Sequence, residues 1–324
     1  MNSLAQINKE IKEKDNFILM GHIDPDGDCI GSLFALKWYL DYLQKKSLVL
    51  LNDHPKEKYD YLAIDTDDYS LFDNFKTAEL NWSDLNYIAL DSGDIERLGK
   101  GKKLVDEHFL INIDHHVDNP EYGNINYINS KTAATGEILY DLFRLDHKRL
   151  NKKISTALAT AVIADTGAMR YQNTTAKIFN MMADFEKRGI KIYQIIKSIF
   201  GSYSYKSVKL KGLVLSTLEL SSDKKIAWLK VEKSFLEKTN TDSKNTSGLV
   251  NYARDIKGVE VGIVFIEAED NSIKVGLRSN NYCPVNKIAA YFDGGGHERA
   301  AGCIVTDSLD KAVKKVINKV ENYV

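Results

Sequence analysis

Hydrophobic residues in the first half of the chain form short continuous runs, separated by stretches in which they recur every three or four positions. Continuous runs predict buried β-strands, and the longer spacing predicts amphipathic helices. The strands are expected at residues 16–22, 47–52, 86–92 and 108–116, and the helices at 29–43, 133–143 and 153–164. Buried strands separated by helices are typical of a parallel sheet covered on both faces, so we expect an α/β fold.

The second half of the chain predicts a helical connection followed by a smaller α/β unit. Residues 175–207 have a helical pattern without proline, which favours a helix or helix pair over a flexible linker. Further strands are expected at 225–232, 259–269 and 272–279, and further helices at 245–256, 284–292 and 309–323. We predict a first domain over 1–190, a helical connector over 191–215 and a second domain over 216–324.

The segment GHIDPDGDCIGS places His22, Asp24, Asp26 and Asp28 at the end of the first predicted strand. Carboxylates packed this closely repel one another unless a cation neutralises them. An acidic loop in water, with Asp28 serving only as a helix N-cap, is the alternative for this segment taken alone. A calcium-binding EF-hand loop does not fit, because its glycine and glutamate are not at the required offsets.

Three further segments carry polar side chains where apolar elements end. Asp91 lies at the end of a predicted strand and Asp165 at the end of a predicted helix, positions at which a lone aspartate is commonly a turn or capping residue. Asp114, His115 and His116 stand together at the tip of another strand, where burying them is costly unless they bind something.

Neighbouring strand residues point to opposite sides, so one histidine of the pair is expected to enter a metal site. We assign His115 as the metal ligand and His116 as the residue that touches a substrate phosphate. Asp114 then fits a supporting role, in which it fixes the orientation of an imidazole.

Ligands of open α/β sheets bind outside the carboxyl ends of the strands, where these side chains are expected to gather. The donors are carboxylates and imidazoles, with no cysteine expected as a partner, which suits Mn²⁺, Mg²⁺ or Co²⁺ better than structural zinc. Two ions sharing Asp91 as a bridging ligand would lie about 3.5–4 Å apart, the spacing that clamps a phosphoryl group.

Composition limits the partners. The chain has 44 basic and 45 acidic residues and a formal charge of −1, which argues against binding to duplex DNA. The N-terminal segment is polar and no apolar stretch is long enough to cross a bilayer, so no membrane association is expected. Cys29, Cys283 and Cys303 have no C-x-x-C spacing, and three reduced, buried thiols fit a cytoplasmic protein.

The motifs HIDPDGD, ALDSGD, IDHH and ADTG, in this order and spacing, resemble the four motifs of the DHH phosphoesterases. Exonucleases, manganese pyrophosphatases, exopolyphosphatases and nanoRNases belong to this family, which is named after the triplet seen here at Asp114–His116. The resemblance implies two bound Mn²⁺ ions and the ligands His22, Asp26, Asp28, Asp91, His115 and Asp165. Asp24 occupies a variable position of the first motif and receives no role.

A second motif, FDGGGHERAAG, covers residues 292–302. Consecutive glycines let a backbone approach a ligand and direct N–H groups at an anion, although a surface turn is the ordinary alternative. Upstream, VGLRSNN carries Arg278 at a strand end, where a solvated arginine is the commoner explanation.

Together these segments resemble the DHHA1 domain that accompanies DHH domains in the nanoRNase and oligonucleotide phosphoesterase branch. The resemblance implies that the nucleotide part of a substrate is bound by Arg278, Ser279, Gly294, Gly295, Gly296, His297 and Arg299. Asp293 departs from the family, which usually has a fourth glycine there. A carboxylate beside an anion-binding loop could weaken binding or point away, and the sequence leaves its effect open.

We therefore expect a manganese-dependent phosphoesterase acting on short oligoribonucleotides or 3′-phosphoadenosine 5′-phosphate (pAp), with Mg²⁺ or Co²⁺ as substitutes and a water activated by two metals. Cyclic di-AMP and pApA phosphodiesterases share these motifs and are not separated from this activity. The nucleotide-binding motifs disfavour an exopolyphosphatase or pyrophosphatase, and retention of every implied ligand disfavours a non-catalytic sensor. A homodimer is compatible by family analogy.

Overall fold

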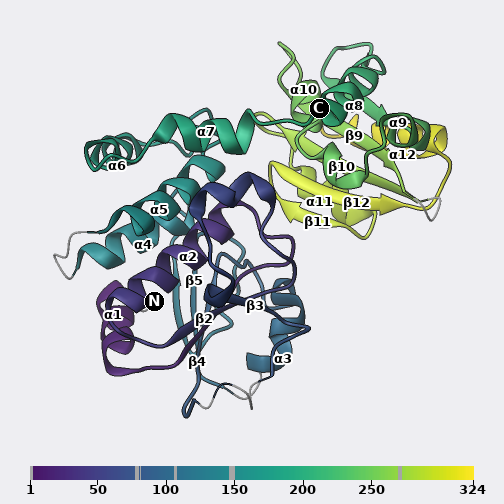
Figure 1. Cartoon of the computed structure of the whole chain (residues 1–324). Coiled ribbons are helices and arrows are strands. Elements are labelled where there is room, and N and C mark those ends of the chain that lie inside the picture. The colour runs from purple at the N-terminus through teal and green to yellow at the C-terminus, as the bar shows by residue number, and fades with distance from the viewer. Residues whose placement is uncertain (1–2, 77–79, 81, 106–107, 146–149, 269–271) are drawn as a thin grey trace. The chain divides into compact units, whose positions relative to one another are not determined.

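The computed structural model describes residues 3–76, 80, 82–105, 108–145, 150–268 and 272–324. It consists of two compact units, Met1–Ser202 and Tyr203–Val324, which run from purple to teal and from green to yellow in Figure 1. The division between them falls inside the segment 191–215 that was expected to connect the domains. Each unit combines a six-stranded sheet with helices, which confirms the α/β class.

The sheet of the first unit has the order β3-β2-β1-β4-β5-β6, and all its strand pairs are parallel. The strands are β1 (Phe17–Met20), β2 (Ser47–Leu51), β3 (Tyr69–Leu71), β4 (Asn86–Leu90), β5 (Leu110–Asp114) and β6 (Ile125–Ile128). Four of them confirm the predicted strands, whereas β3 and β6 are short edge strands without a continuous buried run. The strand order reverses between β1 and β4, the kind of position at which open α/β sheets bind ligands.

Helices cover this sheet through two separate cores. The helices are α1 (Leu4–Glu13), α2 (Gly27–Tyr42), α3 (Lys102–Val105), α4 (Thr135–Arg144), α5 (Lys152–Asp165), α6 (Ala176–Lys187) and α7 (Ile192–Phe200). Phe17 and Leu19 of β1 face the core beneath α2, α4 and α5, while Ile18 and Met20 face a smaller core on the other side. Burial on both faces explains why the strands are continuously hydrophobic.

The start of α2 and the end of α5 both carry predicted site residues, and close packing of the two helices positions them. A β-carbon at Gly31 would lie 2.5 Å from the carbonyl oxygen of Ala157, so only glycine allows this approach of the two helices. The segment 175–207 contains α6, α7 and the start of α8 (Tyr205–Leu215), in agreement with a helix pair rather than a flexible linker. Within the described ranges, no helix combines the length and the apolar character needed to span a bilayer.

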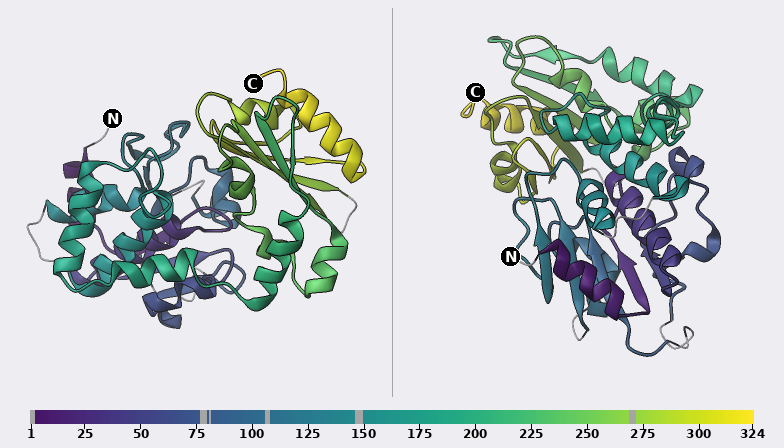
Figure 2. Two further views of the ribbon diagram at one scale, coloured as in Figure 1. Left: turned by 90° about the horizontal axis from the view of Figure 1, so that it is seen from above. Right: turned by 90° about the vertical axis from the view of Figure 1, so that its left-hand side faces the viewer.

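The second unit contains a mixed sheet in the order β11-β12-β10-β9-β8-β7. Its strands are β7 (Glu219–Leu220), β8 (Ile226–Val231), β9 (Val261–Glu267), β10 (Ile273–Ser279), β11 (Gly295–His297) and β12 (Ala300–Val305). Its helices are α8 (Tyr205–Leu215), α9 (Lys233–Thr239), α10 (Val250–Arg254), α11 (Val285–Tyr291) and α12 (Leu309–Val320). α11 and α12 pack on one face and α8, α9 and α10 on the other, as the left view of Figure 2 shows for the green-to-yellow unit.

The glycine-rich segment differs from the expectation of a loop. Gly295–His297 form the edge strand β11, which pairs antiparallel with β12 through a tight connection. Glycine has low strand propensity, but pairing with β12 supplies the backbone hydrogen bonds of a strand. An edge strand has one row of backbone groups without a strand partner, so β11 can still offer N–H groups to a ligand.

Candidate active site

The six side chains predicted as metal ligands converge at the carboxyl-terminal ends of the central strands of the first sheet. They come from the ends of five elements: His22 from β1, Asp91 from β4, His115 from β5, Asp26 and Asp28 from the start of α2, and Asp165 from the end of α5. Because β1, β4 and β5 are neighbouring parallel strands, their carboxyl ends lie together beside the point where the strand order reverses.

His115 is surrounded by three carboxylates. Its Nε2 atom is 3.2 Å from Asp165 Oδ2, 3.5 Å from Asp91 Oδ1 and 3.7 Å from Asp28 Oδ2. Two ligand atoms that share an ion are roughly 3–3.4 Å apart when each bond is about 2.1 Å long. The spacing around His115 is therefore close to that of a metal cluster, and Asp28, His115 and Asp165 form one group that could hold an ion.

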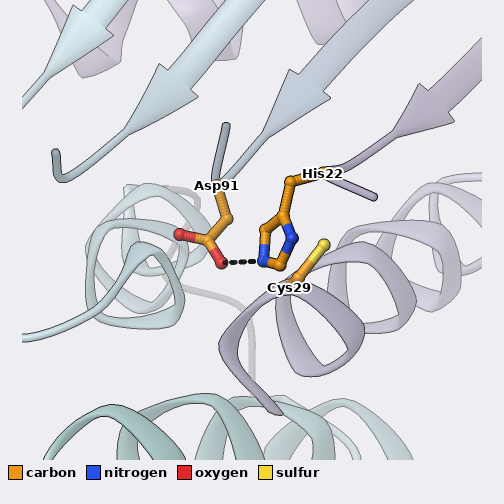
Figure 3. A group of neighbouring side chains, drawn as sticks. All are labelled: His22, Cys29 and Asp91. Carbon is orange, nitrogen blue, oxygen red and sulfur yellow. Dashed lines mark ion pairs between the residues drawn. The ribbon is translucent and has the colours of Figure 1, made fainter. Parts of the chain in front are cut away.

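His22 forms a second corner of the cluster. Its Nδ1 atom is 2.7 Å from the carbonyl oxygen of Ile23, which can only accept, so Nδ1 carries the proton of the neutral ring. Nε2 then has a free lone pair and faces two acceptors, Asp91 Oδ2 at 3.7 Å and Asp26 Oδ1 at 3.9 Å. Figure 3 shows the ring and the Asp91 carboxylate pointing toward each other. Acceptors that face one another in this way fit a bound cation.

Asp91 lies between the two corners. One carboxylate oxygen faces His22 and the other faces His115, which is the arrangement expected of a bridging ligand. The backbone of Asp91 is left-handed (φ 55°), a conformation that aspartate tolerates better than most residues. Burial, and then the charges of Asp28 and Asp26, raise the pKa of Asp91 well above its ordinary value. Without a cation, its negative charge is therefore poorly accommodated.

The amino terminus of α4 supports Asp28. The Asp28 carboxylate accepts from the backbone N–H groups of Thr135 and Gly136 at 2.6 and 3.0 Å and from the Ser32 hydroxyl at 2.9 Å. Burial still raises its pKa, despite the opposing influence of His115. Burial, and then the charges of Asp28 and Asp26, also raise the pKa of Asp165.

Asp26, not Asp28, is the N-cap of α2. Its Oδ1 atom accepts from the N–H groups of Asp28 and Cys29 at 2.9 and 3.1 Å. Desolvation opposes the ionisation of Asp26, but these two N–H groups, together with His22 whenever its ring is protonated, outweigh it and lower the pKa of Asp26. The alternative in which Asp28 serves only as the cap is therefore wrong. Asp24 is exposed and pairs with Lys56 at 2.8 Å, outside the cluster.

Asp114 and His116 form a pair beside the cluster. His116 Nδ1 is 2.7 Å from Asp114 Oδ1, and Asn119 donates to Asp114 Oδ2 at 2.7 Å. Burial would raise the pKa of Asp114, but His116 and Asn119 lower it; Asp114 in turn raises the pKa of His116 against the effect of burial. His116 also belongs, with Asp91 and His115, to a group that could hold an ion. The contact supports the predicted orienting role of Asp114, which stays a prediction.

Cys29 is a member of the cluster that the sequence analysis did not anticipate. One ligand atom each of His22, Cys29 and Asp91 lie within 4.8 Å of one another, and all three residues are buried (Figure 3). The structure thus places a thiol beside the predicted ligands, where the sequence predicted only carboxylates and imidazoles. Burial, and then the charges of Asp91 and Asp26, raise the pKa of the Cys29 thiol. The sequence signal that could have identified Cys29 is its position close to Asp26, the N-cap of α2.

In the second unit, the residues predicted to bind substrate lie on β10, β11 and β12. Two cross-strand rows run over these strands: Gly276–Gly302–Gly295 and Arg278–Ala300–His297. Cross-strand partners share a face of a sheet, so a strip without side chains lies beside Arg278. Gly276 and Gly302 were missed by the sequence analysis, because only strand pairing reveals them. The His297 side chain lies outside the described part of the structure.

The three consecutive glycines serve different purposes. A β-carbon at Gly294 would lie 2.3 Å from the Gly302 carbonyl oxygen, and one at Gly296 would lie 2.6 Å from the Ala300 carbonyl oxygen. A β-carbon at Gly295 would meet nothing within 4 Å. Close packing therefore requires glycine at two of these positions, and the open space lies at Gly295. Asp293 has φ 57°, so glycine would suit the backbone at this position.

A buried carboxylate organises the turn that follows β10. Glu260 accepts from the N–H groups of Asn281, Tyr282 and Cys283 at 3.0, 2.7 and 2.9 Å. These bonds lower the pKa of Glu260 even though burial opposes its ionisation. Glu260 has no local sequence signal for this role, because the N–H groups that it binds lie 21 to 23 residues further along the chain.

Two of the predicted substrate-binding residues donate hydrogen bonds to this turn. The Cys283 carbonyl oxygen accepts from the Ser279 hydroxyl at 2.7 Å and from Arg299 Nη1 at 3.0 Å. Ser279 is only 5% exposed, so its hydroxyl serves this turn. Arg278 donates to the Leu277 carbonyl oxygen at 2.9 Å.

Comparison with known proteins agrees with both the fold and the motifs. The profile of the DHH family N-terminal domain matches residues 16–165, and that of the DHHA1 domain matches residues 223–324. The chain belongs to the DHH family and is a hydrolytic phosphoesterase. Members of this family depend on metal ions, and the donor groups described above could bind them.

Similar proteins include the bifunctional oligoribonuclease and PAP phosphatase NrnA of Thermus thermophilus, which is 30% identical over 92% of this chain and 87% of its own length. A probable bifunctional oligoribonuclease and PAP phosphatase NrnA of Streptococcus mutans is 27% identical over 93% of each chain. An exopolyphosphatase-related protein from Bacteroides fragilis has the same fold, with a TM-score of 0.90, 24% identity and coverage of 99% and 96% of the two chains.

Proposed function

We propose that the protein is a manganese-dependent phosphoesterase that hydrolyses short oligoribonucleotides and pAp. The observation that carries the proposal is the cluster around His115 and His22, in which buried carboxylates face imidazole nitrogens without enough internal donors to neutralise them. The NrnA relatives over most of the chain support the choice of substrate.

The cluster suits two divalent ions that share Asp91. His22, Asp26 and Asp91 would hold one ion, and Asp28, Asp91, His115 and Asp165 the other. Carboxylate and imidazole donors of this kind suit Mn²⁺, with Mg²⁺ or Co²⁺ as substitutes. When bound, such ions polarise a phosphate and lower the pKa of a water molecule. Two dications also balance the four carboxylates, which allows an anionic substrate to approach.

Further residues of each unit are proposed to contact the substrate. Asp114 holds His116 by its Nδ1 atom, and Nε2 of His116 is proposed to donate to a phosphate oxygen of the substrate. In the second unit, Arg278 and the glycine strip of β10, β12 and β11 offer a charged group beside a flat surface, which suits a phosphate next to a nucleobase. Arg299, Gly294, Gly296 and His297 are proposed to support or contact the same nucleotide.

A substrate panel tests the proposal. Purified protein with Mn²⁺ is expected to release mononucleotides from di- to tetraribonucleotides and phosphate from pAp, and to lose both activities with Asp91→Asn. The panel also contains pApA, cyclic di-AMP, pyrophosphate and polyphosphate. Cleavage of cyclic di-AMP alone, or of polyphosphate alone, would replace the proposed substrate class. Binding of nucleotides without any turnover would indicate a sensor.

A further inference from the structure

We propose that Cys29 is a metal ligand, and that the ion held by His22 and Asp91 has a sulfur donor which the second ion lacks. The inference rests on the proposed two-metal function and adds a donor that the family motifs do not assign. It makes the two metal positions chemically unequal. The first would have nitrogen, oxygen and sulfur donors, and the second only nitrogen and oxygen donors.

The position of the sulfur is the first argument. Ligand atoms of His22, Cys29 and Asp91 all lie within 4.8 Å of one another, in a fully buried group. In Figure 3 the Cys29 side chain rises from the start of α2 toward the His22 ring. A β-carbon at Gly21 would lie 2.2 Å from Cys29 Sγ, so the sulfur occupies the space left open by a glycine.

The facing side chains of His22 and Asp91 indicate a cation at the same place, independently of the cysteine. His22 is 6% exposed and Asp91 2% exposed, and His22 Nε2 and Asp91 Oδ2 face each other at 3.7 Å. Nδ1 of His22 is engaged by the Ile23 carbonyl oxygen, so two lone pairs meet across this gap when the ring is neutral. A buried pair of acceptors is costly unless a cation lies between them.

The other groups of potential metal ligands show how the two metal positions would differ. The group Asp28–His115–Asp165 and the group Asp91–His115–His116 contain no sulfur. Thiolate ligands favour thiophilic ions such as Cd²⁺ and Zn²⁺, whereas carboxylates suit Mn²⁺ and Mg²⁺. The structure thus assigns the first position a preference for thiophilic ions, which would displace Mn²⁺ there before they displace it from the second.

The binding step is an exchange of a proton for a metal ion. The S–H bond of Cys29 breaks, the proton leaves to solvent, and the sulfur electron pair is donated to the ion. Nothing is oxidised or reduced. Cd²⁺ uptake at the first position should therefore release one proton more from the wild-type protein than from Cys29→Ala.

Cobalt spectroscopy tests the proposal without relying on catalysis. Titration of the metal-free protein with Co²⁺ is expected to produce a sulfur-to-cobalt charge-transfer band in the near ultraviolet. Cys29→Ala should lose the band, whereas Cys303→Ala, which removes a buried thiol of the second unit, should keep it. Cys29→Ser preserves the size of the side chain and replaces Cys29→Ala if that variant folds poorly.

Competition between ions gives a second measurement. Cd²⁺ binding is expected to weaken at least about tenfold in Cys29→Ala, while Mn²⁺ binding changes less, because lost ligand support commonly costs 10- to 100-fold in affinity. Co²⁺ binding without a charge-transfer band, or an unchanged band in Cys29→Ala, would overturn the assignment. If the protein is active with Mn²⁺ but shows no charge-transfer band, only the assignment of Cys29 is contradicted. If the band appears but the protein is inactive on every substrate, only the proposed function is contradicted.

Discussion

Asp91 and Glu260 are equally buried, with 2% of each residue exposed, yet the pKa values of their carboxylates are shifted in opposite directions. Three backbone N–H groups surround Glu260 and lower its pKa. Asp91 accepts one hydroxyl bond, from Thr135 at 3.2 Å, and faces other carboxylates that raise its pKa. The protein thus completes the surroundings of one carboxylate and leaves those of the other incomplete.

This difference separates a structural carboxylate from a ligand-binding one. Burial alone does not distinguish them, since both are removed from water. What distinguishes them is the number of hydrogen-bond donors that the protein supplies. The turn after β10 supplies enough donors for Glu260, whereas the surroundings of Asp91 at the strand ends of the first sheet do not. A cation from solution supplies what Asp91 lacks, so the incomplete site is the one able to bind metal.

The largest effect is expected at Asp91. Asp91→Asn should abolish Mn²⁺-dependent hydrolysis, because an amide cannot bridge two cations. The same change should stabilise the metal-free protein toward heat, because it removes a buried charge that the protein does not neutralise. Activity assays and thermal denaturation in a chelator measure the two effects.

Asp24→Asn is the matched control, since Asp24 is exposed and pairs only with Lys56 among the contacts described. It should retain activity and leave the metal-free stability unchanged. Full activity of Asp91→Asn would contradict the role assigned to the bridging carboxylate.

Metal binding should produce the next largest effect. Mn²⁺ at a free concentration 100 times its Kd should stabilise the folded protein by about 2.7 kcal/mol, and a chelator should reverse the change. Denaturation with and without Mn²⁺ measures this. A melting temperature that does not respond to Mn²⁺, Mg²⁺ or Co²⁺ would show that the cluster does not need a cation.

Glu260→Gln should destabilise the second unit by about 1–3 kcal/mol, because an amide cannot accept the same set of N–H bonds. Since the turn holds Arg299 and Ser279 through the Cys283 carbonyl oxygen, KM for an oligoribonucleotide should rise more than kcat falls. Glu237→Gln, an exposed change in the same unit, is the control and should leave both quantities unaltered. Equal effects of the two substitutions would remove Glu260 from this role.

The pH dependence of stability separates the two carboxylates further. The pKa of Glu260 is lowered from 4.5, so its contribution is present above that value and is lost as pH falls through the lower folded pKa. The pKa of Asp91 is raised from 3.8, so in metal-free protein its ionisation removes stability as pH rises above that value. Denaturation at several pH values should show the first dependence disappear in Glu260→Gln and the second in Asp91→Asn.

The smallest effect is expected at Asp293. Its left-handed backbone follows α11, and glycine adopts this conformation without strain. Asp293→Gly should stabilise the protein by about 1 kcal/mol or less, since aspartate tolerates the conformation better than most residues. Calorimetry measures the change. Loss of stability would mean that the Asp293 carboxylate has a favourable contact of its own.

Local patterns of the chain were enough to predict the strands that carry the site and the residues at their ends. Strand β1 is hydrophobic throughout because both of its faces are buried, and His22 stands out as a polar residue two positions after the strand ends. The DHH and DHHA1 motifs likewise lie in short contiguous segments, and both domains are confirmed. Such features can be predicted from the sequence because strand burial and motif spacing are properties of neighbouring residues.

The tertiary structure alone decided which further groups join the predicted ligands and support them. The bonds from Thr135 and Gly136 to Asp28 join segments more than 100 residues apart, and Glu260 reaches a turn 21 to 23 residues away. The glycine strip exists only because β10, β12 and β11 pair in one register, and Cys29 joins the cluster because the start of α2 lies beside the end of β1. Packing of helices and pairing of strands set these distances, and neither is encoded in the spacing of residues along the chain.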